Sequence, residues 1–209
     1  MNFILTHGRE VATLTAEHLW LVGVSMLIAV ALGVPLGILL TRRPRLKALV
    51  LGSTNVIQTI PSLALFGLLL PLPWLGARAD RLAIVALALY ALLPIVRNTY
   101  VGIVGVDAPV REAAVAMGLT SSQLLRMVEL PLASPVILAG IRTAVVITIG
   151  VATIAAAIGA GGLGEFIFRG IAMVDNGVIL AGALPAALMA LVADLLLGAA
   201  EKSLARRRH

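Results

Sequence analysis

The most restrictive feature of the sequence is a stretch of 22 residues, 19–40, without a charged side chain. At a helical rise of about 1.5 Å per residue, such a stretch crosses a hydrocarbon layer of about 30 Å. The rest of the chain is similar, since 60% of its 209 residues are hydrophobic and 12% are charged. A soluble fold of this length cannot bury so large an apolar share. The sequence therefore predicts a membrane protein and excludes an ordinary cytosolic enzyme, a disordered chain and, having no cysteine, a disulfide scaffold.

Four more apolar stretches follow the first. The predicted membrane spans are residues 19–40, 48–77, 82–104, 132–160 and 177–200. The second span contains Pro61, and we expect it to bend there because proline removes a backbone hydrogen bond from a helix. The predicted fold class is all-α, a polytopic membrane protein with five transmembrane helices.

The basic residues predict how these helices are oriented. Lysine and arginine number 16 against 10 acidic residues, a net charge of +6, and the basic excess of a membrane protein lies in its cytoplasmic loops. With the N-terminus outside, four basic residues fall outside and ten in cytoplasmic segments. We therefore expect a multi-pass protein of the cell (inner or plasma) membrane with a cytoplasmic C-terminus. The ten are Arg42, Arg43, Arg45, Lys47, Arg111, Arg126, Lys202, Arg206, Arg207 and Arg208. Membrane lipid rather than nucleic acid is the expected partner of this charge.

Residues 106–131, between the third and fourth spans, are too polar to cross a membrane but have a helical composition. We expect two short helices here, hinged at Gly118. The stretch reads Glu112-Ala113-Ala114, three residues, Gly118, nine residues, and Val128-Glu129-Leu130-Pro131. This spacing resembles the EAA loop of ABC-transporter permease subunits, whose pattern has isoleucine in place of Val128. The resemblance implies that a separate ATPase is coupled through a cytoplasmic helix pair containing Glu112, Ala113, Ala114, Gly118, Leu130 and Pro131.

The residue types of this loop suit a rigid docking element. The two alanines permit close approach of another helix. We expect Glu112 in the first turn of its helix, where the helix dipole favours an anion. Gly118 can adopt the left-handed conformation that ends a helix, and Pro131 suits the first turn of the next transmembrane helix. The alternative is an amphipathic hairpin at the membrane surface.

The resemblance covers residues 15–200, the predicted permease domain. Residues 1–14 are then an extracytoplasmic segment and residues 201–209 a basic cytoplasmic tail. Five stretches are similar to importers of osmoprotectants such as glycine betaine, carnitine and choline: residues 58–65, 90–100, 128–132, 140–144 and 158–164. The last is shared with methionine-type importers. The resemblance implies a permease subunit of an ATP-driven, binding-protein-dependent importer that moves substrate by alternating access.

Such an importer also implies partners. These are an ABC ATPase subunit, an extracytoplasmic substrate-binding protein and a second permease subunit, identical or paralogous. The chain has no GxxxxGK[ST] motif, so we expect it to be no enzyme and to hold no cofactor, ATP being bound by its partner. Its eight aromatic residues are dispersed, which predicts that substrate recognition resides mainly in the binding protein. Three scattered histidines form no metal site.

Three ionisable side chains lie within the spans at comparable depth, namely Arg97, Arg142 and Asp194. An unpaired charge at membrane depth is costly. We therefore expect Asp194 to pair with Arg97 or with Arg142, as a buried charge network.

Two further groups of residues are candidates for function. The candidates for the translocation pathway cluster at the expected bend and are Asn55, Gln58, Thr59, Pro61 and Ser62. Hydrogen bonding between helices explains them equally well. The candidates for an outer gate or a ledge for the binding protein are Gly159, Gly161, Gly162 and Gly164. A tight turn followed by an interfacial helix is the alternative there.

Two other functions compete with osmoprotectant import. One is an ABC permease for an amino acid such as methionine. The other, of a different class, is a secondary transporter that works without ATP, for which an inverted repeat would be expected but is not apparent. Dependence on an ATPase separates the second from the ABC class.

Overall fold

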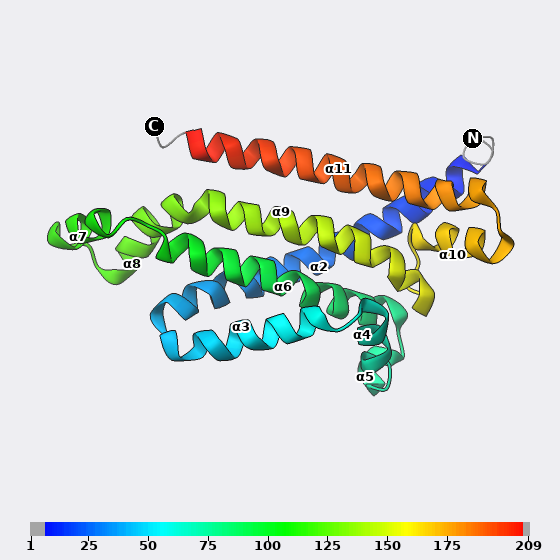
Figure 1. Ribbon diagram of the computed structural model, residues 1–209, viewed down its shortest axis with the longest axis horizontal. Helices are drawn as coiled ribbons and strands as arrows, with labels where there is room; N and C mark the ends of the chain where they lie inside the picture. Colours follow the sequence, from blue (N-terminus) through cyan, green and yellow to red (C-terminus); the bar gives the residue numbers. More distant parts are fainter. Residues whose placement is uncertain (1–6, 207–209) are drawn as a thin grey trace.

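The computed structural model describes residues 7–206, and this part of the chain is helical without a β-strand. The elements are α2 (Gly8–Arg42), α3 (Pro44–Thr59), α4 (Ser62–Leu69), α5 (Pro73–Gly76), α6 (Ala79–Val104), α7 (Ala108–Ala116), α8 (Ser121–Gln123), the π-helical η1 (Leu124–Glu129), α9 (Leu130–Ala155), the 3-10 turn η2 (Ala156–Ile158), α10 (Gly164–Met173) and α11 (Asn176–Arg206). Figure 1 shows α7 and α8 at one end of a bundle of long helices and α10 at the other. The all-α prediction is confirmed.

Four helical segments are long and apolar enough to cross a membrane, and the bent pair α3 and α4 makes a fifth if it counts as one span. This agrees with the five predicted spans. The helices extend past the predicted apolar stretches, since α2 begins at Gly8 and α11 runs to Arg206. Helices of this length leave charged turns beyond a hydrocarbon layer of about 30 Å.

The second span breaks at Pro61, as predicted, but the break is far sharper than a kink. The axes of α3 and α4 differ by 104°. Ile60 and Pro61 are both extended, with ψ angles of 127° and 137°. Proline disfavours the helical conformation of the residue before it, which ends α3 at Thr59. The carbonyl oxygen of Ile60 accepts a hydrogen bond from the hydroxyl of Tyr90 on α6.

Helix α6 lies at the centre, and glycines let its neighbours approach closely. A Cβ atom at Gly37 of α2 would lie 2.5 Å from the Cβ of Thr99, and one at Gly140 of α9 would lie 2.5 Å from the Cβ of Asn98. Small residues at such contacts are how membrane helices pack without a hydrophobic driving force between them. The α2–α6–α9 layer is therefore specified by glycine positions.

This packing predicts that Gly37→Ala destabilises the protein. Overpacking a tight contact costs about 1–3 kcal/mol, or roughly 3–10 °C in the unfolding midpoint at this chain length. Gly23→Ala is the matched control, since Gly23 is on the same helix and a Cβ there meets nothing within 4 Å. Thermal unfolding in detergent compares the two variants. Equal midpoints would show that close packing at Gly37 does not hold α2 against α6.

The polar stretch between α6 and α9 differs from the expected pair of short helices. Only α7 is a separate short helix, because α8 continues through η1 into α9 without a break. The helix begins at Ser121 behind a capping box, in which Gln123 Oε1 accepts from the Thr120 backbone N–H at 2.8 Å. Pro131 therefore does not start the transmembrane helix, and Leu130 is likewise internal to it. The wide π-helical turn just before Pro131 accommodates a residue that cannot donate an ordinary helical hydrogen bond.

The segments predicted to be cytoplasmic lie at one end of the bundle. Figure 1 places the start of α3, the helices α7 and α8, and the C-terminal end of α11 at this end, and the start of α2 with α10 at the other. This is the one-sided arrangement that the predicted topology requires; which side faces the cytoplasm stays a prediction. Arg207 and Arg208, and residues 1–6 of the predicted N-terminal segment, lie outside the described residues.

Candidate functional site

Helix α7 forms a projecting knob whose outer face is chemically mixed. Ala114 is only 2% exposed and anchors the helix, whereas Val115 and Met117 are 58% and 74% exposed. Glu112 and Ala113 are also exposed. Glu112 is the fifth residue of α7 and not in its first turn as expected, because the helix already begins at Ala108 with a proline in its first turn. The knob thus presents an acid beside apolar side chains, a surface suited to docking.

Gly118 ends this knob in the left-handed conformation, as predicted. Its φ is +85°, and a Cβ atom there would meet nothing within 4 Å. Glycine is therefore required by the backbone and not by lack of space. The N–H of Leu119 donates to the carbonyl of Ala114 at 3.2 Å, closing the end of α7.

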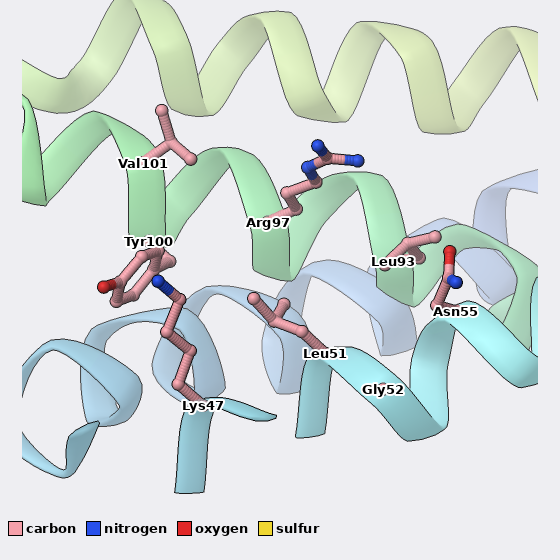
Figure 2. A pocket seen from close by; sticks show the side chains of 8 residues that line it. All are labelled: Lys47, Leu51, Gly52, Asn55, Leu93, Arg97, Tyr100 and Val101. Atoms are coloured by element: carbon pink, nitrogen blue, oxygen red, sulfur yellow. The ribbon is translucent and has the colours of Figure 1, made fainter. Parts of the chain in front are cut away.

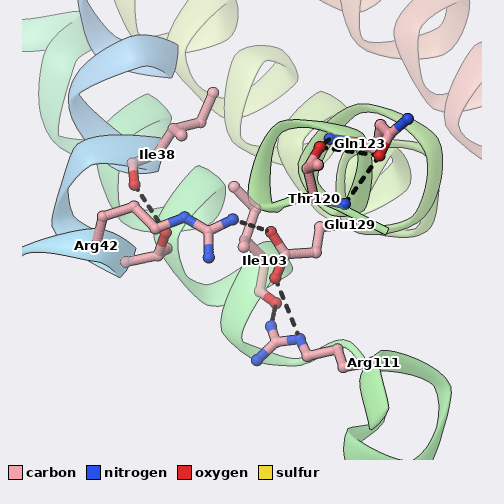
Figure 3. Close-up of polar contacts among 8 residues, drawn as sticks. Ile38, Arg42, Ile103, Arg111, Thr120, Gln123 and Glu129 are labelled. Atoms are coloured by element: carbon pink, nitrogen blue, oxygen red, sulfur yellow. Dashed lines mark hydrogen bonds and ion pairs between the residues drawn. The ribbon is translucent and has the colours of Figure 1, made fainter. Parts of the chain in front are cut away.

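A buried carboxylate fastens the knob to the bundle. The side chain of Glu129 is 3% exposed and lies 2.7 Å from Nη2 of Arg42 and 3.4 Å from Nε of Arg111. Arg111 also donates to the carbonyl oxygen of Ile103, at the end of α6 (Figure 3). One side chain thus links η1 to the end of α2 and to the start of α7. We call Arg42, Arg111 and Glu129 the Glu129 clamp.

Glu129 lies inside the motif of the predicted loop, but no role was predicted for it. A cationic partner for Glu129 could have been predicted, because a carboxylate between Val128 and Leu130 in an apolar helix needs one. The two arginines that supply it were assigned only to topology.

The expected charge network is present, but it is partly exposed and not buried, and its membership differs. Asp194 pairs with Arg142, whose Nε lies 2.6 Å from Oδ1, and Nη1 of Arg142 also contacts Glu201 at 3.1 Å. Gly198, on α11, leaves room for the guanidinium, since a Cβ there would lie 3.0 Å from Nη1. Of the two expected partners for Asp194, the structure shows Arg142, and Glu201 is an additional member. The network joins α9 to α11.

A double-mutant cycle tests this pair. We expect Arg142→Gln and Asp194→Asn each to lower the unfolding midpoint, and the double variant to lose less than the sum, because the contact between these two side chains can be lost only once. Arg97→Gln is the matched control and should be additive with Asp194→Asn. Midpoints measured in one detergent give the comparison. Additivity of Arg142→Gln with Asp194→Asn would show that the contact carries no energy.

Arg97 lies elsewhere, in a groove between α3 and α6 (Figure 2). The groove has a volume of about 490 Å³, and Lys47, Leu51, Gly52, Asn55, Leu93, Arg97, Tyr100 and Val101 line it. Of the five predicted pathway residues, only Asn55 is among them. Gln58, Thr59, Pro61 and Ser62 gather at the break between α3 and α4, and Thr59 Oγ1 donates to the carbonyl of Val56 at 2.7 Å.

The glycine-rich segment forms a turn fastened to α2. Gly159, Gly161 and Gly162 have φ angles of 78°, 82° and 82°. The N–H of Gly162 donates to Glu17 Oε2 at 3.1 Å. Gly164 differs, since it starts α10, and a Cβ there would overlap the carbonyl oxygen of Thr153. The turn and the amphipathic helix α10 that follows are both present, and a gate or ledge role stays a prediction.

Comparison with known proteins gives the family and the fold. Residues 33–209 match the family model described as binding-protein-dependent transport system inner membrane component. The chain is 52% identical to a glycine betaine/carnitine/choline transport system permease protein of Bacillus subtilis, over 86% of this chain and 77% of that one. It is 47% identical to an osmoprotectant import permease protein of Salmonella typhimurium, over 94% and 93%. A solved structure of the inward-facing MetNI methionine ABC transporter is similar in fold, with a TM-score of 0.80 and 24% identity over 90% and 93%.

Proposed function

The chain belongs to the family of binding-protein-dependent transport system inner membrane components, and from this premise we propose that it carries osmoprotectants with a quaternary ammonium group into the cell. Members of the family are membrane subunits of ABC transporters and are not themselves enzymes. The proposed substrates are glycine betaine, carnitine and choline. The observation that carries this proposal is the 52% identity to a permease protein named for these three compounds.

In this proposal partner proteins bind ATP, deliver the substrate and complete the translocation pathway. An ATPase subunit binds ATP and docks on the knob formed by α7, an extracytoplasmic binding protein delivers the substrate, and a second permease subunit completes the pathway. The exposed Glu112, Val115 and Met117 support a docking role for α7. The Glu129 clamp would pass motion of the knob to α2 and α9, and the two permease subunits would alternate between inward and outward openings.

Methionine import is the weaker alternative. The likeness to the methionine transporter is at 24% identity and concerns the fold. Uptake by cells that express the complete transporter separates the two functions. We expect accumulation of labelled glycine betaine or choline that excess unlabelled methionine does not reduce. Accumulation of methionine, with neither quaternary amine taken up, would overturn the proposal.

A further inference from the structure

The groove between α3 and α6 has an unusual balance of charge. Two of its eight lining residues are basic, Lys47 and Arg97, and none of the eight is acidic. Asn55 and Tyr100 add an amide and a phenol, and the remaining lining is apolar. A volume of about 490 Å³ is within the range of about 300–1,000 Å³ found for small-molecule sites. The groove therefore suits a small ligand with a negatively charged group.

The two cations of the groove are not equivalent. The Lys47 ammonium lies 4.7 Å from the centre of the Tyr100 ring, and this contact orients it. Arg97 is exposed in the groove, and no ion pair holds it in residues 7–206. Arg42, Arg111 and Arg142 are each paired with a carboxylate. Arg97 is thus the basic residue of the groove that is free to bind a ligand.

Within the part of the chain that the structure describes, Arg97 has no ion-pair partner although it lies within a membrane-spanning helix. It lies seven residues before the end of α6 at Val104, or roughly 10 Å along the helix. A guanidinium at such depth is costly unless it faces a wet cavity or an anion. Figure 2 shows Arg97 on α6 and Asn55 on α3, with Leu93 between them in this view. Asn55 lines the same groove, and its amide can donate a hydrogen bond to a carboxylate bound there.

We propose that Arg97, with Asn55, binds the carboxylate of a substrate passing through the groove and so favours carboxylate-bearing osmoprotectants over choline. This inference rests on the proposed function. Glycine betaine and carnitine combine a quaternary ammonium with a carboxylate, whereas choline has a hydroxyl in its place. Guanidinium binds carboxylate through two parallel hydrogen bonds, which a hydroxyl cannot reproduce. Arg97 is therefore a specificity-determining residue of the permease.

The test compares glycine betaine with choline in the complete transporter, with its ATPase and binding protein, reconstituted in vesicles. We expect Arg97→Gln to lower the ratio of glycine betaine to choline uptake by about tenfold or more. Asn55→Ala should shift the ratio in the same direction but less. Arg81→Gln, at an exposed arginine of the same helix that does not line the groove, is the matched control and should leave the ratio unchanged. These substitutions do not change the affinity of the separate binding protein for either compound. A change in the ratio of glycine betaine to choline uptake therefore arises in the permease.

Several outcomes overturn the inference. An equal loss of both uptakes in Arg97→Gln would make Arg97 structural, and an unchanged ratio would make it irrelevant to selection. Vesicles of neutral phospholipid are compared with vesicles containing anionic phospholipid, and a shift confined to the latter would assign Arg97 to a lipid headgroup. A wild-type transporter that takes up neither compound would contradict the proposed function itself. If the wild type takes up both compounds and Arg97→Gln does not change the ratio of their uptake, the inference about Arg97 fails but the proposed function stands.

Discussion

We expect Gly118→Pro to abolish ATP-driven uptake while the chain still inserts into the membrane and remains folded. Proline fixes φ near −65°, whereas Gly118 has a φ of +85°. The variant therefore cannot end α7 in its native geometry, and the knob is misdirected. The α2–α6–α9 packing does not involve Gly118, so the loss should fall on coupling. Uptake, and stimulation of ATP hydrolysis by loaded binding protein, are measured on the reconstituted transporter.

Two further substitutions separate backbone geometry from side-chain bulk. The space around Gly118 is open, since a Cβ atom there meets nothing within 4 Å. Asparagine tolerates the left-handed conformation, and Gly118→Asn should retain most of the uptake. Gly118→Val should lose much more, because β-branched residues disfavour this conformation. Normal uptake by Gly118→Pro would show that the end of α7 has no part in coupling.

The second large effect is expected from Glu129→Gln, which keeps the shape of the side chain and removes its charge. Breaking a buried ion pair costs about 3–5 kcal/mol. We expect a smaller loss, of about 2 kcal/mol, because Arg42 is 41% exposed and can be rehydrated. A loss of this size lowers the unfolding midpoint by roughly 4–8 °C. Uptake should fall with it, since the clamp holds α7 against α2.

The control for Glu129→Gln comes from the same π-helical segment. Arg126 is charged but exposed, and Arg126→Gln should leave the unfolding midpoint unchanged within about 1 °C, as surface substitutions generally do. Thermal unfolding of the purified variants in one detergent gives the comparison. Equal midpoints for Glu129→Gln and the wild type would mean that the contacts of the clamp contribute nothing to stability.

Much of the fold could be predicted because the bilayer imposes strong constraints. Uncharged stretches located the spans because charged side chains are costly in hydrocarbon. Pro61 located the break between α3 and α4 because proline disfavours the helical conformation of the residue before it. Gly118 was predictable because glycine, having no Cβ, adopts the left-handed conformation that ends a helix. The uninterrupted helix from Ser121 was missed, although Thr120 and Gln123 have the spacing of a capping box. The proline at 131 was instead interpreted as a helix start.

The side-chain contacts of the site were harder to predict. Counting residues along a helix gives depth in the membrane, so Arg97, Arg142 and Asp194 could be placed at similar depth. Counting does not give rotation about the helix axis when a helix is apolar on every side. Arg142 faces α11 and Asp194, whereas Arg97 lies in the groove beside α3. The pairing of Glu129 with two distant arginines depends on the same unknown rotation.

We expect this chain to transport substrate only when an ATPase drives it. The most direct measurement is uptake of labelled glycine betaine by vesicles containing the chain alone or with its ATPase and binding protein, with and without ATP. We predict accumulation only in the complete system with ATP, and none with the chain alone under any ion gradient. Accumulation by the chain alone, driven by a proton or sodium gradient, would contradict the account and indicate a secondary transporter.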